Sequence, residues 1–138
     1  MDVRASTSFR REPAAVPAAR AFVRHAVRST GAAPETVDRL VLAAAEAFNN
    51  AILHAAGDTF GVRIIIDSRS CTVMVTDAGR GFQPPTHPRM PAADDTGHRG
   101  LAIMEALVDE VDVRSSPAGT RVVLVQSLLD DARLLADF

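Results

Sequence analysis

Three polar side chains recur at every fourth position near the middle of the chain, at Glu46, Asn50 and His54. Residues four apart share one face of an α-helix, so these three would form a single stripe opposite an apolar face. A carboxylate can accept the proton of an attacking hydroxyl, and an asparagine oxygen one turn later can bind a hard cation such as Mg²⁺. A solvated polar face is the alternative for Glu46 and Asn50, and an exposed or capping histidine is the simpler interpretation of His54.

A second candidate site begins at Asp77, directly after a run of β-branched residues that ends at Thr76. Residues 77–81 have the pattern D-x-G-x-G, with glycines at Gly79 and Gly81. An aspartate at a strand end can accept a hydrogen bond from an exocyclic amine such as that of adenine, and the glycines allow close backbone approach. An ordinary Asp/Gly turn is the alternative interpretation of this motif.

A third pattern, Gly-His-Arg-Gly-Leu at residues 97–101, opens a segment of helical character. The free N–H groups and the dipole at a helix N-terminus attract anions, so this segment is a candidate phosphate site. A helix entry with flexible glycines is its alternative. A fourth pattern, Gly119-Thr120 before the last run of β-branched residues, would by itself be only a turn.

The elements that would position these residues follow from hydrophobic periodicity and from turn signals. Apolar residues at helical spacing predict two helices, and Gly31 ends the first of them while Gly57 is a candidate C′ residue of the second. The long segment 77–97 is rich in Gly, Pro and Asp, and a loop of this length in a small domain is usually functional. The expected elements are a strand at 3–9, helices at 16–29 and 34–56, a hairpin of strands 62–67 and 71–76, a helix at 100–108, and strands at 110–115 and 120–127, with the tail 128–138 left unassigned.

The composition restricts how such a site could handle phosphate. The chain has 138 residues and all 15 of its basic side chains are arginine, while tryptophan and tyrosine are also absent. A Schiff-base lysine or the lysine of a Walker P-loop is therefore excluded. The net charge of −2 argues against a mainly electrostatic nucleic-acid binder, so we expect no direct contact with nucleic acid.

Compartment and class follow from similar arguments. No apolar run approaches the ~18 residues that span a bilayer, and the polar N-terminus does not resemble a signal peptide. The one cysteine, Cys71, cannot form an internal disulfide, which favours a reducing cytoplasm, and it begins an apolar run as a small core residue would. We therefore expect a cytoplasmic protein without a membrane partner.

The order of the four patterns resembles the GHKL, or Bergerat-fold, ATPase superfamily, which includes gyrase, Hsp90, histidine kinases and MutL. Within it the chain looks like the small bacterial anti-sigma factor serine/threonine kinases. The resemblance covers about residues 9–125 and is carried by the stretches 45–52 (AEAFNNAI), 100–105 (GLAIME), 108–113 (VDEVDV) and 115–120 (SSPAGT). It implies one domain over residues 1–138 with an α+β fold, a two-layer sandwich of a mixed, mostly antiparallel sheet with helices on one face.

The resemblance also implies roles for individual residues. Glu46 would be the general base that activates a serine or threonine hydroxyl, and Asn50 would hold Mg²⁺ against the phosphates of ATP. Asp77 would bind the adenine amino group, and Arg20 would contact protein partners. The remaining positions implied to bind the nucleotide are Gly79, Gly81, Gly97, His98, Gly100, Leu101 and Thr120, with an ATP lid at about 82–97 and with Arg89 or Arg99 neutralising the γ-phosphate.

The function that this resemblance implies is that of a dimeric kinase that sequesters a sigma factor and phosphorylates a STAS-domain antagonist. One residue departs from the family pattern, since His98 stands where a glycine is usual, and a Cβ there restricts the backbone. This departure favours a competing hypothesis, a non-catalytic ATP-binding switch that sequesters a partner, whereas Glu46 and Asn50 favour catalysis. An ATPase domain of the sensor histidine kinase type is a third interpretation, less favoured because no helix with a phosphoacceptor histidine precedes the domain.

Overall fold

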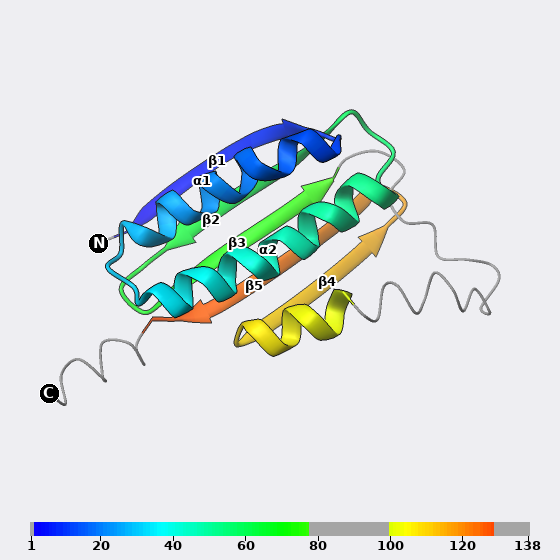
Figure 1. Ribbon diagram of the computed structural model, residues 1–138. Coiled ribbons are helices and arrows are strands. Elements are labelled where there is room, and N and C mark those ends of the chain that lie inside the picture. Colours follow the sequence, from blue (N-terminus) through cyan, green and yellow to red (C-terminus); the bar gives the residue numbers. More distant parts are fainter. Residues whose placement is uncertain (1, 78–99, 129–138) are drawn as a thin grey trace, which may run out of the picture.

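The computed structural model describes residues 2–77 and 100–128 (Figure 1). Along the chain, an N-terminal strand is followed by a pair of long helices, a first hairpin, a further helix and a second hairpin. The elements are β1 (Val3–Arg10), the 3-10 helix η1 (Pro13–Ala15), α1 (Val16–Arg28), α2 (Pro34–His54), β2 (Thr59–Ile66), β3 (Ser70–Asp77), a helix over residues 100–107, β4 (Glu110–Ser116) and β5 (Gly119–Ser127). The predicted loop at 78–97 and the tail beyond 128 lie outside the described residues.

Five strands form one sheet in the order β1-β2-β3-β5-β4. Every pairing among the described strands is antiparallel, so the sheet is not mixed as expected. The reason lies in the connections, because β2–β3 and β4–β5 are hairpins, which join antiparallel neighbours. Between β1 and β2 the chain runs through two antiparallel helices, so it returns to the sheet in the opposite direction (Figure 1).

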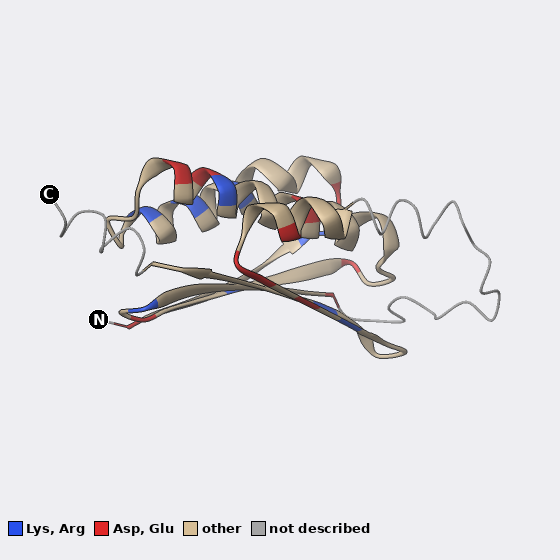
Figure 2. Ribbon diagram, turned by 90° about the horizontal axis from the view of Figure 1, so that it is seen from below, with Lys and Arg blue, Asp and Glu red and all other residues tan. Residues whose placement is uncertain are grey.

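The molecule has two layers, with α1, α2 and the helix 100–107 on one face of the sheet (Figure 2). Alternate residues of β2, β3 and β5 are buried beneath these helices, as the period of two along a strand requires. Helix α2 is buried along a broad face because it lies over the centre of the sheet (Figure 1). The predicted fold class, an α+β two-layer sandwich with helices on one face, is confirmed.

Aromatic rings join the helical layer to the sheet at one end of the core. Phe60 on β2 lies with its ring centroid 5.8 Å from that of Phe9 on β1 and 5.7 Å from that of Phe48 on α2. Phe9 in turn meets Phe22 of α1 edge-on, with centroids 6.1 Å apart. These contacts connect β1, β2 and both long helices, so the position of α2 over the sheet is set by packing around Phe60.

The glycines predicted at the ends of α1 and α2 have different outcomes in the structure. Gly31 has φ +79° and ends the turn after α1, as predicted. The expectation for Gly57 was wrong, because α2 ends at His54 and the extended residue Ala55 follows, with no left-handed glycine at this helix end. Cys71 is a free and fully buried thiol, and burial raises its pKa to about 12, in keeping with a core residue.

Candidate functional site

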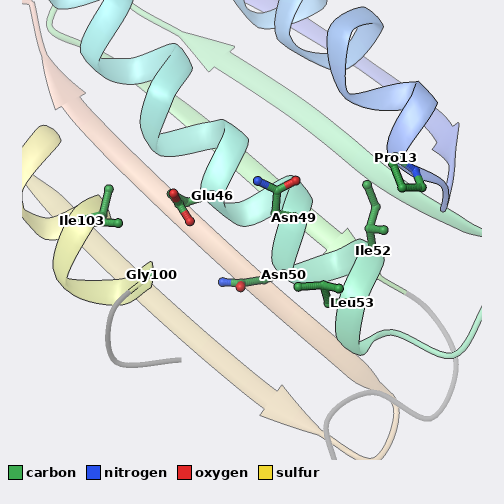
Figure 3. Close-up of a pocket in the computed structure, with 8 residues that line it drawn as sticks. All are labelled: Pro13, Glu46, Asn49, Asn50, Ile52, Leu53, Gly100 and Ile103. Atoms are coloured by element: carbon green, nitrogen blue, oxygen red, sulfur yellow. The ribbon is translucent and has the colours of Figure 1, made fainter. Parts of the chain in front are cut away.

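Glu46 and Asn50 occupy successive turns near the C-terminal end of α2, where both side chains are half-buried. Figure 3 shows both side chains directed from α2 toward Gly100, the first described residue of the helix 100–107. A Cβ built on Gly100 would lie 3.6 Å from Asn50 Nδ2 and 3.7 Å from Glu46 Oε2. The structure thus brings together three of the predicted site residues, although Gly100 follows Asn50 by 50 residues and Glu46 by 54.

Gly100 faces the carboxylate and the amide without a side chain between them. A pocket of about 360 Å³ lies here, between α2 and the helix 100–107. Its lining residues are Pro13, Glu46, Asn49, Asn50, Ile52, Leu53, Gly100 and Ile103 (Figure 3). The pocket thus holds a carboxylate and an amide beside a glycine of the candidate phosphate site that the sequence predicts.

Asp77 ends β3 at the same end of the sheet, where β5 begins and α2 ends (Figure 1). Its Oδ1 accepts a hydrogen bond of 3.1 Å from the backbone N–H of Thr120, which places the predicted Gly-Thr pair beside it. Burial raises the pKa of Asp77, while this hydrogen bond and the charge of Arg11 oppose the rise. A half-buried carboxylate whose second oxygen has no hydrogen bond to the described residues suits the recognition of a donor on a ligand.

Gly119 has a conformational reason to be glycine. Its φ is +145°, and a Cβ there would collide with the carbonyl oxygen of Asp77. The backbone of the β4–β5 turn can therefore approach the end of β3 closely only because this residue has no side chain. Thr120 is held in addition by its hydroxyl, which lies 2.7 Å from that of Ser115.

The other predicted residues lie apart from the cluster of Glu46, Asn50 and Gly100 and from the cluster of Asp77 and Thr120, or they lie outside the described residues. His54 is exposed at the end of α2, as its simpler interpretation predicts, and Arg20 is exposed on α1. Leu101 is half-buried and follows Gly100 in the helix 100–107. Gly79, Gly81, Arg89, Gly97, His98, Arg99 and the lid at 82–97 lie outside the described residues, so their roles stay predictions.

The residues beside Gly100 fit a magnesium ion bound largely through phosphates. Magnesium prefers oxygen ligands and is usually held by one or two protein groups together with substrate oxygens. Asn50 offers one amide oxygen, and Glu46 offers a carboxylate one turn away. Within residues 2–77 and 100–128 no group of three acidic, histidine or cysteine side chains could hold a metal alone. These two oxygen donors are compatible with an ion that is shared with a nucleotide.

Sequence reasoning missed Arg11, whose side chain contacts the end of α2 and whose charge acts on Asp77. Its Nε donates to the carbonyl oxygen of Gly57 at 2.6 Å and its Nη1 to that of Ile52 at 2.5 Å. Since no motif includes this position, only a contact map could have found it. The exposed apolar side chains beside the pocket, Leu53 and Ile103, were also missed, because a single apolar residue on a helix surface carries no signal.

Comparison with known proteins places the chain in a family. The model of the histidine kinase-like ATPase domain matches residues 9–126, most of the chain, and the chain therefore belongs to this ATPase family. The resemblance that the motif order indicated, to GHKL ATPases and within them to anti-sigma factor kinases, is confirmed. Family membership implies that the chain binds ATP.

Individual relatives agree with this assignment. The anti-sigma F factor of Clostridium acetobutylicum is 29% identical over 109 residues, which cover 70% of this chain and 76% of that protein. The structure of the RsbU and RsbW domains of Rv1364c from Mycobacterium tuberculosis has the same fold, with a TM-score of 0.72 and 24% identity over 91% of this chain. The histidine kinase domain of a blue-light activated kinase from Erythrobacter litoralis matches 75% of this chain at 25% identity, with a TM-score of 0.51. This chain spans about a third and about half of the lengths of those two solved chains, respectively.

Proposed function

We propose that this protein is an anti-sigma factor and an ATP-dependent serine/threonine protein kinase that phosphorylates a STAS-domain antagonist. The observation that carries the proposal is the meeting of Glu46, Asn50 and Gly100, a carboxylate and an amide facing a glycine of the predicted phosphate site. The similarity to an anti-sigma F factor supports the assignment of the partners. The alternative, a switch protein that binds ATP without transfer, shares the nucleotide site and differs only in the role of Glu46.

The proposed reaction uses Glu46 as the general base. The oxygen of a serine or threonine hydroxyl attacks the γ-phosphorus of ATP, and its proton passes to the Glu46 carboxylate. The bond between the γ-phosphorus and the β–γ bridging oxygen breaks, and ADP leaves with that oxygen. Magnesium held by Asn50 would neutralise charge on the phosphates. The N–H groups that follow Gly100 would hold the same phosphates from the other side of the pocket.

Adenine recognition is assigned to Asp77. Because Oδ1 already accepts the N–H of Thr120, Oδ2 is the atom available to accept the adenine amino group. Recognition by a hydrogen bond agrees with a chain that has no tryptophan or tyrosine for stacking. Phosphates would be met by Asn50 and by backbone N–H groups, so the absence of lysine is no obstacle.

The partner surface is proposed to include Arg20. This side chain is exposed on α1, on the helical face of the molecule. A sigma factor bound there would be held away from RNA polymerase. The family resemblance favours a homodimer, and the single cysteine favours a reducing cytoplasm. Among the described helices none has the length and apolar character needed to cross a membrane.

The proposal is tested by replacing the base with its isosteric amide. Glu46→Gln keeps the size of the side chain but cannot take a proton, so transfer of labelled phosphate from ATP to a STAS protein should fall about 100-fold or more. ATP binding, measured by titration, should remain. Glu105→Gln is the matched control, because Glu105 is an exposed carboxylate on the helix 100–107. Unchanged transfer by Glu46→Gln would exclude Glu46 as the base, and ATP binding by the wild-type chain without any transfer would favour the switch.

A further inference from the structure

Arg11 crosses the gap between the end of β1 and the end of α2. Its backbone N–H donates to the carbonyl oxygen of Asp58 at 2.8 Å, which anchors it directly after the last β1–β2 pair. From this anchor the guanidinium reaches both Ile52, in the last turn of α2, and Gly57, in the segment that follows the helix. The side chain is half-buried, and it contacts two backbone carbonyls that lie 41 and 46 residues further along the chain.

The end of α2 needs such a partner. The last carbonyls of a helix have no intrahelical N–H donor, and a left-handed glycine often supplies the missing geometry. Here the residue after the helix, Ala55, is extended, so the helix lacks that kind of cap. Arg11 takes over part of this role by donating to Ile52, which lies two residues after Asn50. The last turn of α2 is thereby tied to the sheet.

The end of β1, next to Arg11, is also connected to Asp77 across the sheet. In the strand register Phe9 pairs with Phe60, and Phe60 pairs with Asp77, so the three residues lie side by side on β1, β2 and β3. Arg11 follows Phe9 by two residues and lies close enough for its charge to act on the carboxyl of Asp77. One side chain therefore contacts the helix end that carries Asn50 and influences the strand end that carries Asp77.

We propose that Arg11 is a positioning residue of the nucleotide site, which sets the C-terminal end of α2, and with it Asn50, relative to the strand end at Asp77. This inference rests on the proposed function, because it assumes that both ends of the site hold one nucleotide. An arginine suits the task better than a lysine, since its planar fork donates to two carbonyls at once and keeps its charge. Arg11 itself is not assigned any contact with the nucleotide.

The experiment compares Arg11→Gln, Arg11→Lys and the control Arg10→Gln. Arg10 is the exposed last residue of β1, next to Arg11, and makes no side-chain hydrogen bond to the described residues. ATP affinity would be measured by titration between pH 4 and pH 8, and folding would be followed by thermal unfolding. Among the described residues the groups that act on Asp77 are the N–H of Thr120 and the charge of Arg11.

Arg11→Gln is expected to weaken ATP binding about 10-fold, the usual effect of losing a supporting contact. The pH below which affinity is lost should also move upward, because removing the positive charge raises the pKa of Asp77 further. Arg11→Lys keeps the charge but not the fork, so its pH profile should match that of the wild type while its affinity is reduced. Arg10→Gln should change neither quantity.

A cap that served stability alone would give a different result. If Arg11→Gln lowers the unfolding temperature but keeps the wild-type affinity and pH profile, the proposal is overturned and Arg11 is only a helix cap. If the glutamine variant does not fold, Arg11→Lys tests the proposal instead, because wild-type affinity in the lysine variant would also overturn the proposal. If the wild-type chain binds no ATP, the proposed function is rejected as well. If the wild type binds ATP and both variants bind it equally well, only this inference is rejected.

Discussion

Asp77 is the residue where the local chemistry is most finely balanced. Burial makes ionisation of its carboxyl costly, and the N–H of Thr120 and the charge of Arg11 recover only part of that cost. The carboxylate therefore lowers the stability of the fold at neutral pH while it provides an acceptor for a ligand. Sites that bind polar ligands often contain groups whose ionisation is unfavourable for folding.

Replacing Asp77 by asparagine should separate these two effects. Because the pKa of Asp77 is raised above 3.8 in the folded chain, the stability it contributes is greatest below that pH and is lost as pH rises through the folded pKa. Asp77→Asn does not titrate, so it should be more stable than the wild type at pH 7, and this advantage should disappear near pH 3.5. Urea unfolding at the two pH values measures the difference.

The same variant should bind ATP poorly. With Oδ1 held by the N–H of Thr120, the amide nitrogen would take the place of Oδ2 and would point a donor at the adenine amino group. A loss of at least about 10-fold in affinity is expected from this mismatch. A variant that binds ATP like the wild type, or whose stability advantage is equal at both pH values, would contradict this account of Asp77.

At the scale of elements, the site depends on two close approaches of backbone. The helix 100–107 lies against α2 at Gly100, where an added Cβ would make only ordinary contacts with Asn50 and Glu46, whereas the β4–β5 turn lies against β3 because Gly119 has no side chain. Both approaches join an element of the second half of the chain to one of the first half. The candidate site therefore exists only when the two halves pack together.

Gly119→Ala should damage both the fold and the site. The new Cβ would collide with the carbonyl of Asp77 and would impose a disfavoured backbone conformation at φ +145°, at a cost of about 1–3 kcal/mol or more. Nucleotide affinity should fall as well, because the end of β3 must move. Urea unfolding and ATP titration measure the two losses.

Gly31→Ala is the matched control for this prediction. Gly31 also has a positive φ, +79°, but an added Cβ would meet nothing within 4 Å. We expect a stability loss of about 1 kcal/mol from the backbone alone and no change in ATP affinity. If the two alanine variants lost affinity equally, the collision with Asp77 would not be the cause.

For the whole molecule, the packing between one helical layer and one sheet decides stability. Phe60 is 1% exposed and its ring contacts those of Phe9 and Phe48, so it joins two strands and α2. The other face of the sheet carries no helix among the described residues (Figure 2). Nearly all large buried side chains lie in the single layer between the sheet and the helices.

Phe60→Ala should accordingly cost about 3–5 kcal/mol in the free energy of unfolding, the range for deleting a buried aromatic ring. Val113→Ala is the control, because Val113 is 44% exposed on the edge strand β4 and should change stability by only about 0.5 kcal/mol. Chemical denaturation of both variants gives the comparison. Equal losses would show that the core is not centred on Phe60.

Much of the fold could be predicted because periodicity reports local structure directly. The helix of residues 34–54 and the strands around Ile64 and Val75 differ from the expected ranges by only a few residues. The end of α2 was less predictable, since Gly57 has the right residue type for a helix cap but another side chain does that work. Local propensity cannot foresee a partner from the opposite end of the domain.

For the candidate site, the sequence by itself determined which groups are available, namely Glu46 and Asn50 one turn apart, Asp77 at a strand end, and a glycine-flanked helix start. It also excluded lysine from the handling of phosphate. Only the tertiary structure decided that Gly100 lies against Glu46 and Asn50, that Thr120 donates to Asp77, and that Arg11 joins the helix end to the sheet. The physical reason is range, because spacing along a chain sets contacts within one turn or one hairpin, whereas contacts 40 or more residues apart depend on how the layers pack.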